Sequence, residues 1–363
     1  MIAVEVSFLR LSARLFAGLF LGAAVLVLGV VARYNFLHDM SGVLRSDFSA
    51  PRSIEPNEHF VKMRYIIEQV PAKYDTFCFG SSRVGNLDLR AHAGGEHAYN
   101  MTYSLGLPAE WLADLRLMIA HGVEIRHVFI GLDDSSFRMD PAEHAHDFIR
   151  IPYQEWNGVT YLTYAFKMPN LQPMSVTEKK NLYDIYDTGR PLHPWADEQI
   201  EQDVAAHRAD RRFRQLPDVG AENMRKLFHD ERITQTVDAL RSIRELCDAH
   251  DIELTVFINP IYELTYLTND LAQFDAFKRE LATVVSYYDF SGINHVTVDP
   301  YYFYEASHYR PLTGDRMLAC MMDGAPADGD GFGFFVTGEN VERHLTDQQM
   351  RTAEWRERHA GKN

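Results

Sequence analysis

The sequence predicts a three-layer α/β protein, in which helices cover both faces of a parallel sheet and a transmembrane helix precedes the folded domain. Three short apolar runs have the character of buried strands: 76–79, 127–130 and 253–258. Three longer stretches have helical periodicity: 58–70, 109–121 and 221–250. Alternation of this kind is typical of a parallel sheet between two layers of helices. The transmembrane helix is predicted from one uncharged segment, 15–32.

The segment 15–32 contains no charged or strongly polar residue, and a bilayer crossing takes about 20 such residues. Arg10 and Arg14 precede it, so the positive-inside tendency predicts that residues 1–14 stay in the cytoplasm and that the rest is exported. A cleaved signal peptide ending near Ala32 is the alternative. We prefer an uncleaved anchor, because the apolar core exceeds the ~7 to 15 residues that are usual in signal peptides.

After the anchor, we expect a linker over residues 33–55 and one exported domain over residues 56–363. Within that domain the alternation of strands and helices stops between residues 140 and 218. An insertion of this length is usually a cap or a binding surface. Its aromatic residues either stack on sugar rings or form the core of a small helical subdomain, and the second interpretation is preferred. They are Trp156, Tyr161, Tyr164 and Phe166.

Composition narrows the classes of partner. The net charge of −15 argues against nucleic acid and against a basic contact with anionic lipid. Three cysteines, Cys78, Cys247 and Cys320, lie in apolar or helical stretches and are predicted to be buried thiols rather than a disulfide framework. The histidines show no spacing typical of a metal site, so we expect neither a metal nor another cofactor.

A serine pair follows the first predicted strand, in the segment Phe79-Gly80-Ser81-Ser82-Arg83-Val84. Gly80 allows the chain to turn sharply there, because it has no side chain. A serine on such a turn exposes its hydroxyl, and its N–H lies near the start of the next helix, where an oxyanion could be held. The simpler alternative is a turn in which a serine only caps that helix.

A carboxylate and an imidazole lie together late in the chain, in the segment Tyr304-Glu305-Ala306-Ser307-His308-Tyr309. Glu305 precedes His308 by three residues, which is close enough to orient the ring and to stabilise its protonated form. Because the chain has 16 histidines, a surface histidine is the alternative. With the early serine, this pair supplies the components of an acyl-transfer triad.

The order of these two segments resembles the SGNH/GDSL hydrolase superfamily. In that family the nucleophile follows the first strand in a Gly-Asp-Ser motif, and the acid and the base form a late Asp-x-x-His. The resemblance implies a flavodoxin-like parallel sheet, with Ser82 as the nucleophile and His308 as the base. It also implies Glu305 as the acid, so that Glu stands where the family has Asp.

Two intermediate segments resemble the family's remaining blocks. Residues 98–106 resemble the block whose glycine N–H is an oxyanion donor, which implies an oxyanion hole of Ser82, Gly106 and Asn100. The segment Gly131-Leu132-Asp133-Asp134 stands where the family has Gly-x-Asn-Asp. Asp133 therefore replaces an amide by a carboxylate, which would repel an oxyanion. The alternative is that both aspartates only cap a helix or line a turn.

Five residues beside these motifs are candidate substrate contacts: Arg83, Asp133, Asp134, Asn259 and Tyr309. Several of them follow a predicted strand, and ligands of parallel α/β sheets bind beyond the carboxyl ends of the strands. For Asn259, a purely structural role in an Asn-Pro turn is a sufficient explanation and is preferred.

The C-terminal segments 287–290, 309–315 and 317–318 resemble exported SGNH-like proteins of bacterial surface polysaccharides. These include the alginate-type O-acetyltransferases and the D-alanyl transfer proteins of teichoic acid systems. The resemblance implies serine-dependent acyl transfer or ester hydrolysis on an exported polysaccharide or another acylated glycan, with a membrane-bound acyl donor protein as a further candidate partner. It implies a single-pass protein of the bacterial inner membrane, with its domain in the periplasm or outside the cell. The alternatives are an inactive protein that binds glycan or helps to assemble a polysaccharide complex, and a structural component of a membrane export complex.

Overall fold

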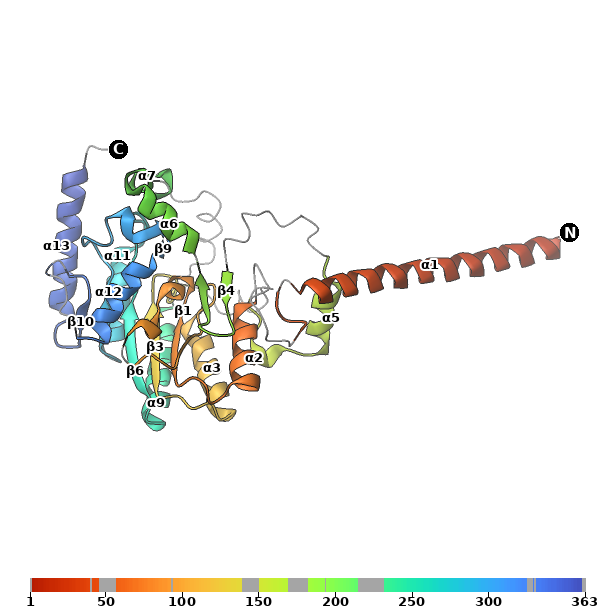
Figure 1. Cartoon of the computed structure of the whole chain (residues 1–363), viewed down its shortest axis with the longest axis horizontal. Helices are drawn as coiled ribbons and strands as arrows, with labels where there is room; N and C mark the ends of the chain where they lie inside the picture. Colours follow the sequence, from red (N-terminus) through yellow and green to blue (C-terminus); the bar gives the residue numbers. More distant parts are fainter. Residues whose placement is uncertain are drawn as a thin grey trace.

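The computed structural model describes residues 2–39, 41–45, 57–92, 94–138, 150–168, 182–192, 194–214, 232–324, 329 and 331–360. They form an α/β fold with a mostly parallel six-stranded sheet, many helices and one long apolar helix at the N-terminus (Figure 1). The sheet and most of the helices make up the body of the molecule, and the N-terminal helix projects away from it.

Five strands of the sheet run parallel in the order β2, β1, β3, β6 and β7, and β10 adds an antiparallel edge beside β7. Their bounds are Thr76–Gly80 for β1, Ala98–Asn100 for β2, His127–Leu132 for β3, Glu253–Ile258 for β6, Tyr287–Asp289 for β7 and Phe334–Val336 for β10. The three predicted strands are confirmed as β1, β3 and β6. Sequence analysis missed β7 and β10, which are short and lie toward one edge.

Seven helices precede, separate or follow these strands: α2 (Glu58–Gln69), α3 (Pro108–Ala120), α9 (Ile233–Ala249), α10 (Glu263–Thr268), α11 (Leu271–Ala282), α12 (Pro311–Met321) and α13 (Val341–His359). The predicted helices at 58–70 and 109–121 are confirmed as α2 and α3. Only part of the prediction at 221–250 falls on described residues, where the chain forms α9, and residues 221–231 lie outside them. α2 begins where it does because the Asn57 side chain accepts a hydrogen bond from the Phe60 N–H at 3.2 Å.

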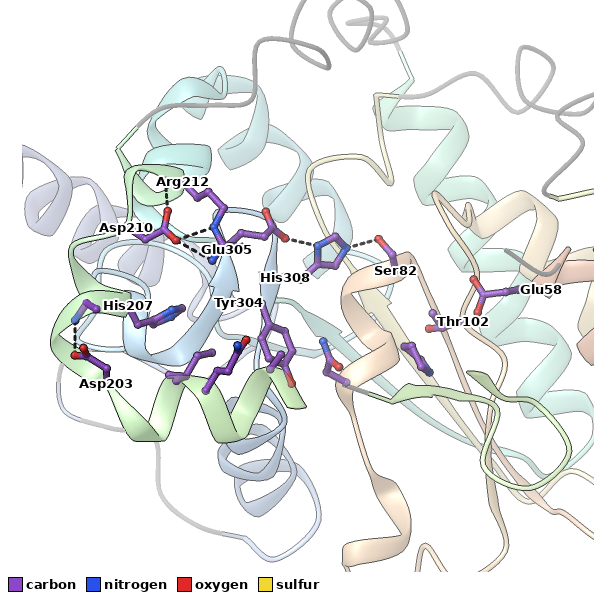
Figure 2. Close-up of a pocket in the computed structure, with 16 residues that line it drawn as sticks. Glu58, Ser82, Thr102, Asp203, His207, Asp210, Arg212, Tyr304, Glu305 and His308 are labelled. Atoms are coloured by element: carbon purple, nitrogen blue, oxygen red, sulfur yellow. Dashed lines mark hydrogen bonds and ion pairs between the residues drawn. The ribbon is translucent and has the colours of Figure 1, made fainter. Parts of the chain in front are cut away.

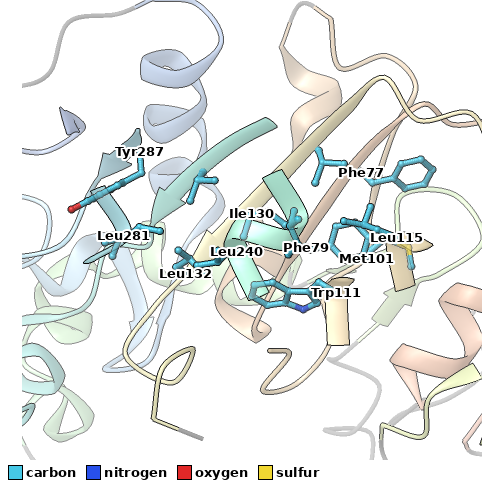
Figure 3. Close-up of a cluster of buried hydrophobic side chains, with 14 of the residues drawn as sticks. Phe77, Phe79, Met101, Trp111, Leu115, Ile130, Leu132, Leu240, Leu281 and Tyr287 are labelled. Carbon is cyan, nitrogen blue, oxygen red and sulfur yellow. The ribbon is translucent and has the colours of Figure 1, made fainter. Parts of the chain in front are cut away.

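Alternate side chains of β1 enter two different apolar clusters. Phe79 belongs to a cluster with Trp111 of α3, as Figure 3 shows. Cys78, the preceding residue, belongs to a second cluster with Leu318 of α12. Because successive side chains of a strand point to opposite faces, both faces of the sheet are buried. The open ends of the strands are therefore the places left for a site.

The N-terminal helix α1 (Ile2–His38) is longer than the predicted membrane segment. Its apolar part, Ala13–His38, is long enough to cross a membrane, and none of it is buried against the rest of the protein. An apolar N-terminal helix of this kind is consistent with a signal sequence or an anchor. The first residues of the expected linker, 33–38, are part of this helix. Val43 and Leu44 pack into an apolar cluster of the domain, and residues 40 and 46–55 of the expected linker lie outside the described residues.

The described parts of the predicted insertion, 140–218, divide between two places. α5 (Gly158–Phe166) lies at the foot of α1 (Figure 1), where Trp156 and Tyr164 pack near Phe60 in an apolar cluster. The other two aromatic residues of the prediction, Tyr161 and Phe166, are exposed. The later elements are β4 (Leu182–Asp184), β5 (Arg190–Leu192), α6 (Pro194–Gln202), α7 (Val204–Arg208) and the 3-10 turn η5 (Arg211–Phe213). Residues 140–149, 169–181, 193 and 215–218 lie outside the described residues.

Candidate active site

The serine pair follows the carboxyl end of β1, where the 3-10 turn η1 (Ser82–Asn86) begins. Gly80 is required there by a close approach and not by an unusual turn, since a Cβ at this position would lie 2.3 Å from Val84 Cγ2. Ser81 caps η1 and is buried, and its Oγ donates to Asp133 Oδ2 at 2.5 Å. Ser82 instead lines a pocket. The structure thus separates a supporting serine from an accessible one.

The carboxylate and the imidazole lie on a small hairpin formed by β8 (Phe303–Glu305) and β9 (His308–Tyr309). The two strands are antiparallel, and Glu305 pairs directly with His308 across the turn. This register places Glu305 Oε1 2.5 Å from His308 Nδ1. Glu305 Oε2 accepts the Ser307 N–H at 2.8 Å, which fixes the carboxylate.

The hairpin brings His308 to the serine turn. His308 Nε2 lies 2.8 Å from Ser82 Oγ there (Figure 2). Burial by itself raises the pKa of Glu305, but the hydrogen bond and the charge of His308 outweigh it and hold that pKa below its ordinary value. An ionised carboxylate only accepts hydrogen bonds, so Nδ1 carries the proton of the neutral ring. Nε2 is then the acceptor for the Ser82 hydroxyl, which is the arrangement of a nucleophile and its general base.

The three residues open on a pocket of about 620 Å³. Its described lining comes from the nucleophile turn, the hairpin, the start of α2 and the segment β5 to η5. Figure 2 shows Ser82 between His308 on one side and Thr102 and Glu58 on the other. The remaining wall carries hydrogen-bonding groups of the insertion: Gln199, Asp203, His207, Asp210 and Arg212. This volume lies within the range of about 300–1,000 Å³ that is typical of small-molecule sites.

Asp133 does not face this pocket. It is fully buried, and its Oδ1 accepts hydrogen bonds from the Ser135 N–H (2.9 Å) and the Ser135 hydroxyl (2.5 Å). Its Oδ2 accepts from Ser81 and lies 3.1 Å from Arg83 Nη1. Burial alone raises the pKa of Asp133, but the charge of Arg83 and the serine hydrogen bonds outweigh it, and the pKa lies below its ordinary value. The expected repulsion of an oxyanion is thus balanced by a paired cation.

The other candidate contacts also lie behind the pocket lining. Asp134 accepts a hydrogen bond from Arg83 Nη1 at 2.7 Å, so the two residues form an ion pair. Asn259 is buried, and its amide donates to the Leu132 carbonyl at 3.0 Å. Tyr309 is buried as well and donates to Asn259 Oδ1 at 3.2 Å. These side chains support the strand ends, and none of them belongs to the described lining.

Two of the expected oxyanion donors are occupied by local hydrogen bonds. The Asn100 amide donates to the carbonyls of Val84 (2.9 Å) and Leu87 (3.5 Å), so it holds η1 in place. The Gly106 N–H donates to the Tyr103 carbonyl at 3.2 Å within a turn. Neither residue belongs to the described lining of the pocket. In this structure both residues therefore hold the backbone around the site in place and do not contact the pocket.

Sequence analysis missed several lining residues. Thr102 belongs to the same block as Asn100 and Gly106 and is the member that reaches the pocket, where its Oγ1 lies 3.4 Å from the Ser81 carbonyl. Glu58 comes from the start of α2 and lies 3.2 Å from the buried Lys62 Nζ. Burial raises the pKa of Glu58 above its ordinary value. The block around Thr102 offered a signal in the sequence, whereas an acidic residue at a helix start is too common to offer one.

Hydrogen bonds and ion pairs attach the insertion to the segment that carries Glu305 and His308. Arg310 is buried and donates to Asp197 at 2.8 Å and to Glu201 at 2.7 Å, both on α6. His207 of α7 lies 2.8 Å from the Phe303 carbonyl through its Nε2. These contacts fix the far wall of the pocket relative to the hairpin. The α6 to η5 part of the insertion thus lines the pocket, and its role as a cap or binding surface stays a prediction.

Within the described ranges, no group of three or more His, Cys, Asp or Glu side chains is placed to hold a metal ion. No disulfide joins the three cysteines, of which Cys78 and Cys247 are buried and Cys320 is half-buried. Burial raises the pKa of the Cys78 thiol and raises that of Cys247 to about 11, so neither is a thiolate at neutral pH. The nucleophilic group at the described pocket is therefore a hydroxyl.

Comparison with known protein families finds no family model that matches this sequence, and comparison with curated proteins finds no match either. The chemistry assigned to the pocket therefore depends on the contacts and distances within this chain.

Proposed function

We propose that this protein is a serine-dependent esterase or acyltransferase that acts on a polysaccharide or another acylated glycan. The observation that carries the proposal is the hydrogen-bonded chain from Ser82 Oγ through His308, 2.8 Å away, to Glu305, 2.5 Å further on. That chain opens on a pocket of about 620 Å³ rather than on bulk solvent or the core. A nucleophile, a base and an orienting acid in this order are the requirements of acyl transfer.

The first half of the reaction transfers the acyl group to the protein. His308 Nε2 takes the proton of Ser82 as Oγ attacks the ester carbonyl, and Glu305 stabilises the imidazolium that forms. The tetrahedral intermediate then collapses, the bond to the alcohol oxygen breaks, and the imidazolium gives its proton to that oxygen. The acyl group remains as an ester on Ser82.

The second half regenerates the serine. A sugar hydroxyl or a water molecule gives its proton to His308 and attacks the acyl carbonyl, and the same proton returns to Ser82 Oγ as the acyl–serine bond breaks. A sugar hydroxyl makes the reaction a transfer, and water makes it a hydrolysis. The wall formed by α6, α7 and η5 decides between them, because it controls how much water reaches the acyl-serine.

The oxyanion is assigned to two donors near the nucleophile. The Ser82 N–H is the first of η1, so it has no acceptor within that turn. Thr102 lines the pocket, and its hydroxyl donates a long hydrogen bond of 3.4 Å to the Ser81 carbonyl, which it can exchange for a bond to the oxyanion. This assignment replaces the Asn100 amide and the Gly106 N–H, which are engaged elsewhere.

The strand order supports the finer description of the fold. The sequence β2, β1, β3, β6, β7 corresponds to the order 2-1-3-4-5 of flavodoxin-like sheets. Ser82 follows the carboxyl end of β1, next to the crossover between β1 and β3 where such sheets bind ligands. A three-layer flavodoxin-like domain of the SGNH type accounts for both facts.

The proposal that the substrate is a glycan is supported by the polar side chains of the pocket wall opposite the nucleophile. Gln199, Asp203, Asp210 and Arg212 offer donors and acceptors to a substrate rich in hydroxyl groups. The N-terminal apolar helix supports an anchor in a bacterial inner membrane with the domain on its outer side. α1 also continues without a break past Ala32, the end of the alternative signal peptide, to His38. A membrane-bound acyl donor protein would meet the site on that side.

One observation favours a second candidate, a catalytically inactive protein that binds glycan or helps to assemble a polysaccharide complex. Two side chains stand at the expected oxyanion positions, Asn100 and Asp133. Both make hydrogen bonds to neighbouring groups of the protein instead. A protein that needed only the pocket would tolerate this. The two candidates differ in whether the Ser82 hydroxyl reacts.

Hydrolysis of small acetyl esters by the full-length protein tests the proposal. We expect turnover in the parent chain and a loss of at least about a thousandfold in Ser82→Ala and in His308→Ala. His92→Ala is the matched control, because His92 pairs with Asp323 and does not belong to the described pocket lining. Turnover that persists in both active-site variants contradicts the proposal. Absence of turnover together with retention of glycan favours the second candidate.

A further inference from the structure

A second apolar surface lies at the foot of α1, on the short helix α5 (Gly158–Phe166). Val159, Leu162 and Phe166 are 74%, 54% and 42% exposed, and Met168, just beyond the helix, is 83% exposed. Val159, Leu162 and Phe166 are spaced three and four residues apart, so they lie on one face of the helix. Four large apolar side chains on one short segment are unusual for a surface that meets only water.

The opposite face of α5 is firmly attached to the domain. Tyr164 and Ala165 are buried in the apolar cluster that also contains Val43 and Phe60. Asn157 caps the start of the helix by accepting the N–H groups of Val159 (2.9 Å) and Thr160 (3.2 Å). The exposed face is therefore held outward by an ordered helix and is not a frayed end.

The end of α5 is also attached to α1. The Asn35 amide donates to the carbonyls of Tyr164 (3.4 Å), Ala165 (2.9 Å) and Lys167 (2.7 Å). Tyr164 and Ala165 belong to the last turn of α5, and Lys167 is the residue that follows the helix. A residue of the N-terminal helix thus caps α5, and Figure 1 shows the two helices meeting at this point.

The position of Asn35 places α5 at a defined depth. A bilayer core is crossed by about 20 helical residues, so a span that begins near Ala13 or Leu15 ends just before Asn35. The exposed side chains of Phe36 and Leu37 lie in the same region. Because α5 is attached at that level, its apolar face meets the boundary between lipid headgroups and acyl chains rather than open solvent.

We propose that α5 is an interfacial helix that inserts its apolar face, Val159, Leu162, Phe166 and Met168, into the outer leaflet of the membrane that α1 crosses. The occupant of this face is lipid, because α5 is attached to α1 at Asn35, beside the exposed apolar residues Phe36 and Leu37. With α1 it gives the domain two attachments to the membrane. Two attachments fix the orientation of the domain, whereas α1 alone would leave it free to rotate. The inference rests on α1 crossing the membrane and is independent of the proposed chemistry.

Tryptophan substitution in the full-length protein tests this proposal. Leu162→Trp is placed on the apolar face, Leu19→Trp in the exposed part of α1, and Met350→Trp on the exposed surface of α13 as the matched control. Each variant is reconstituted in phosphatidylcholine vesicles with and without bromines on the acyl chains near the headgroup. The signal of the parent chain is subtracted. We expect bromolipid to reduce the added emission of Leu162→Trp and Leu19→Trp about twofold, and to leave Met350→Trp unchanged.

Acrylamide in the aqueous phase gives the complementary reading. It should quench Met350→Trp strongly and Leu162→Trp weakly. Quenching of Leu162→Trp by acrylamide but not by bromolipid means that the face is open to water, and overturns the proposal. Protection from both quenchers means that protein covers the face, and overturns it as well. If Leu19→Trp is not quenched by bromolipid, α1 does not cross the bilayer and the proposal fails with it.

Discussion

Arg83 donates from its Nε to the backbone carbonyl of Ser307 at 2.9 Å, and this bond joins the nucleophile turn to the hairpin of the base. The same guanidinium donates to Asp134 at 2.7 Å and lies 3.1 Å from Asp133. Three segments that are far apart in the sequence therefore meet at one planar cation. The relative position of the nucleophile and the base depends on this junction.

Arg83→Lys keeps the positive charge but removes the planar guanidinium, whose several N–H groups contact Ser307, Asp133 and Asp134 at once. We expect kcat to fall about 10- to 100-fold with little change in KM, because the hairpin moves relative to the serine while the far wall of the pocket is retained. Steady-state kinetics on a small ester measures both values. Arg279→Lys, which changes an exposed pair with Glu342, is the matched control. An unchanged kcat in Arg83→Lys would show that the junction does not position the site.

Thr102→Val removes the hydroxyl assigned to the oxyanion and keeps the shape of the side chain. We expect kcat to fall about 10²- to 10³-fold, which is typical for the loss of one oxyanion donor. Thr102→Ser restores a hydroxyl and should recover most of the rate. Equal rates in the valine and serine variants would exclude Thr102 as a donor and leave the Ser82 N–H alone in that role.

Glu305→Gln removes the charge that stabilises the imidazolium, and its amide oxygen can still accept the Ser307 N–H. We expect a loss of about 10³- to 10⁴-fold in kcat with an unchanged melting temperature, because the amide also permits the wrong tautomer of His308. Glu305→Asp keeps the charge but is one methylene too short for this hairpin, so an intermediate rate should result. A glutamine variant that is as active as the parent contradicts the role of Glu305 as the acid.

Stability should depend on acid pH through Asp133. Its pKa lies below the ordinary value of 3.8 in the folded protein, so the folded state favours the ionised form. The contribution of its charge to stability is therefore complete above the ordinary pKa and is lost as the pH falls through the lowered one. Urea unfolding of the parent and Asp133→Asn from about pH 7 to about pH 3 measures this. The difference in unfolding free energy should shrink toward acid pH, and a constant difference contradicts the account.

The sequence predicted the central strands and the chemical groups of the site, because both depend on local patterns. Apolar runs identify β1, β3 and β6 directly. The spacing of Glu305 and His308 was informative for a reason that the structure makes visible: a two-residue hairpin turn places residues three apart directly opposite each other. Short strands such as β7 and β10, of three residues each, carry too few residues for their pattern to be recognised.

The placement of polar residues behind or inside the pocket could not be predicted. Asp133 and Asn259 follow strands and Tyr309 is the last residue of one, and a strand end shows where a residue lies but not whether its side chain faces substrate or a neighbouring group. Only the tertiary contacts show that Arg83 neutralises Asp133. The wall supplied by α6 and α7 depends on the pairing of Arg310 with Asp197 and Glu201, more than a hundred residues away.

Covalent labelling by a serine-directed phosphonate tests the central claim most directly. The full-length protein is treated with the reagent and digested, and the modified residue is identified by mass spectrometry. The account predicts modification of Ser82, its loss in Ser82→Ala, and strong slowing in His308→Ala. Ser81→Ala is the matched control and should still be labelled, because Ser81 is buried against Asp133. Absence of any modification at Ser82 in folded protein, or equal labelling of Ser81, would contradict a nucleophilic serine at this site.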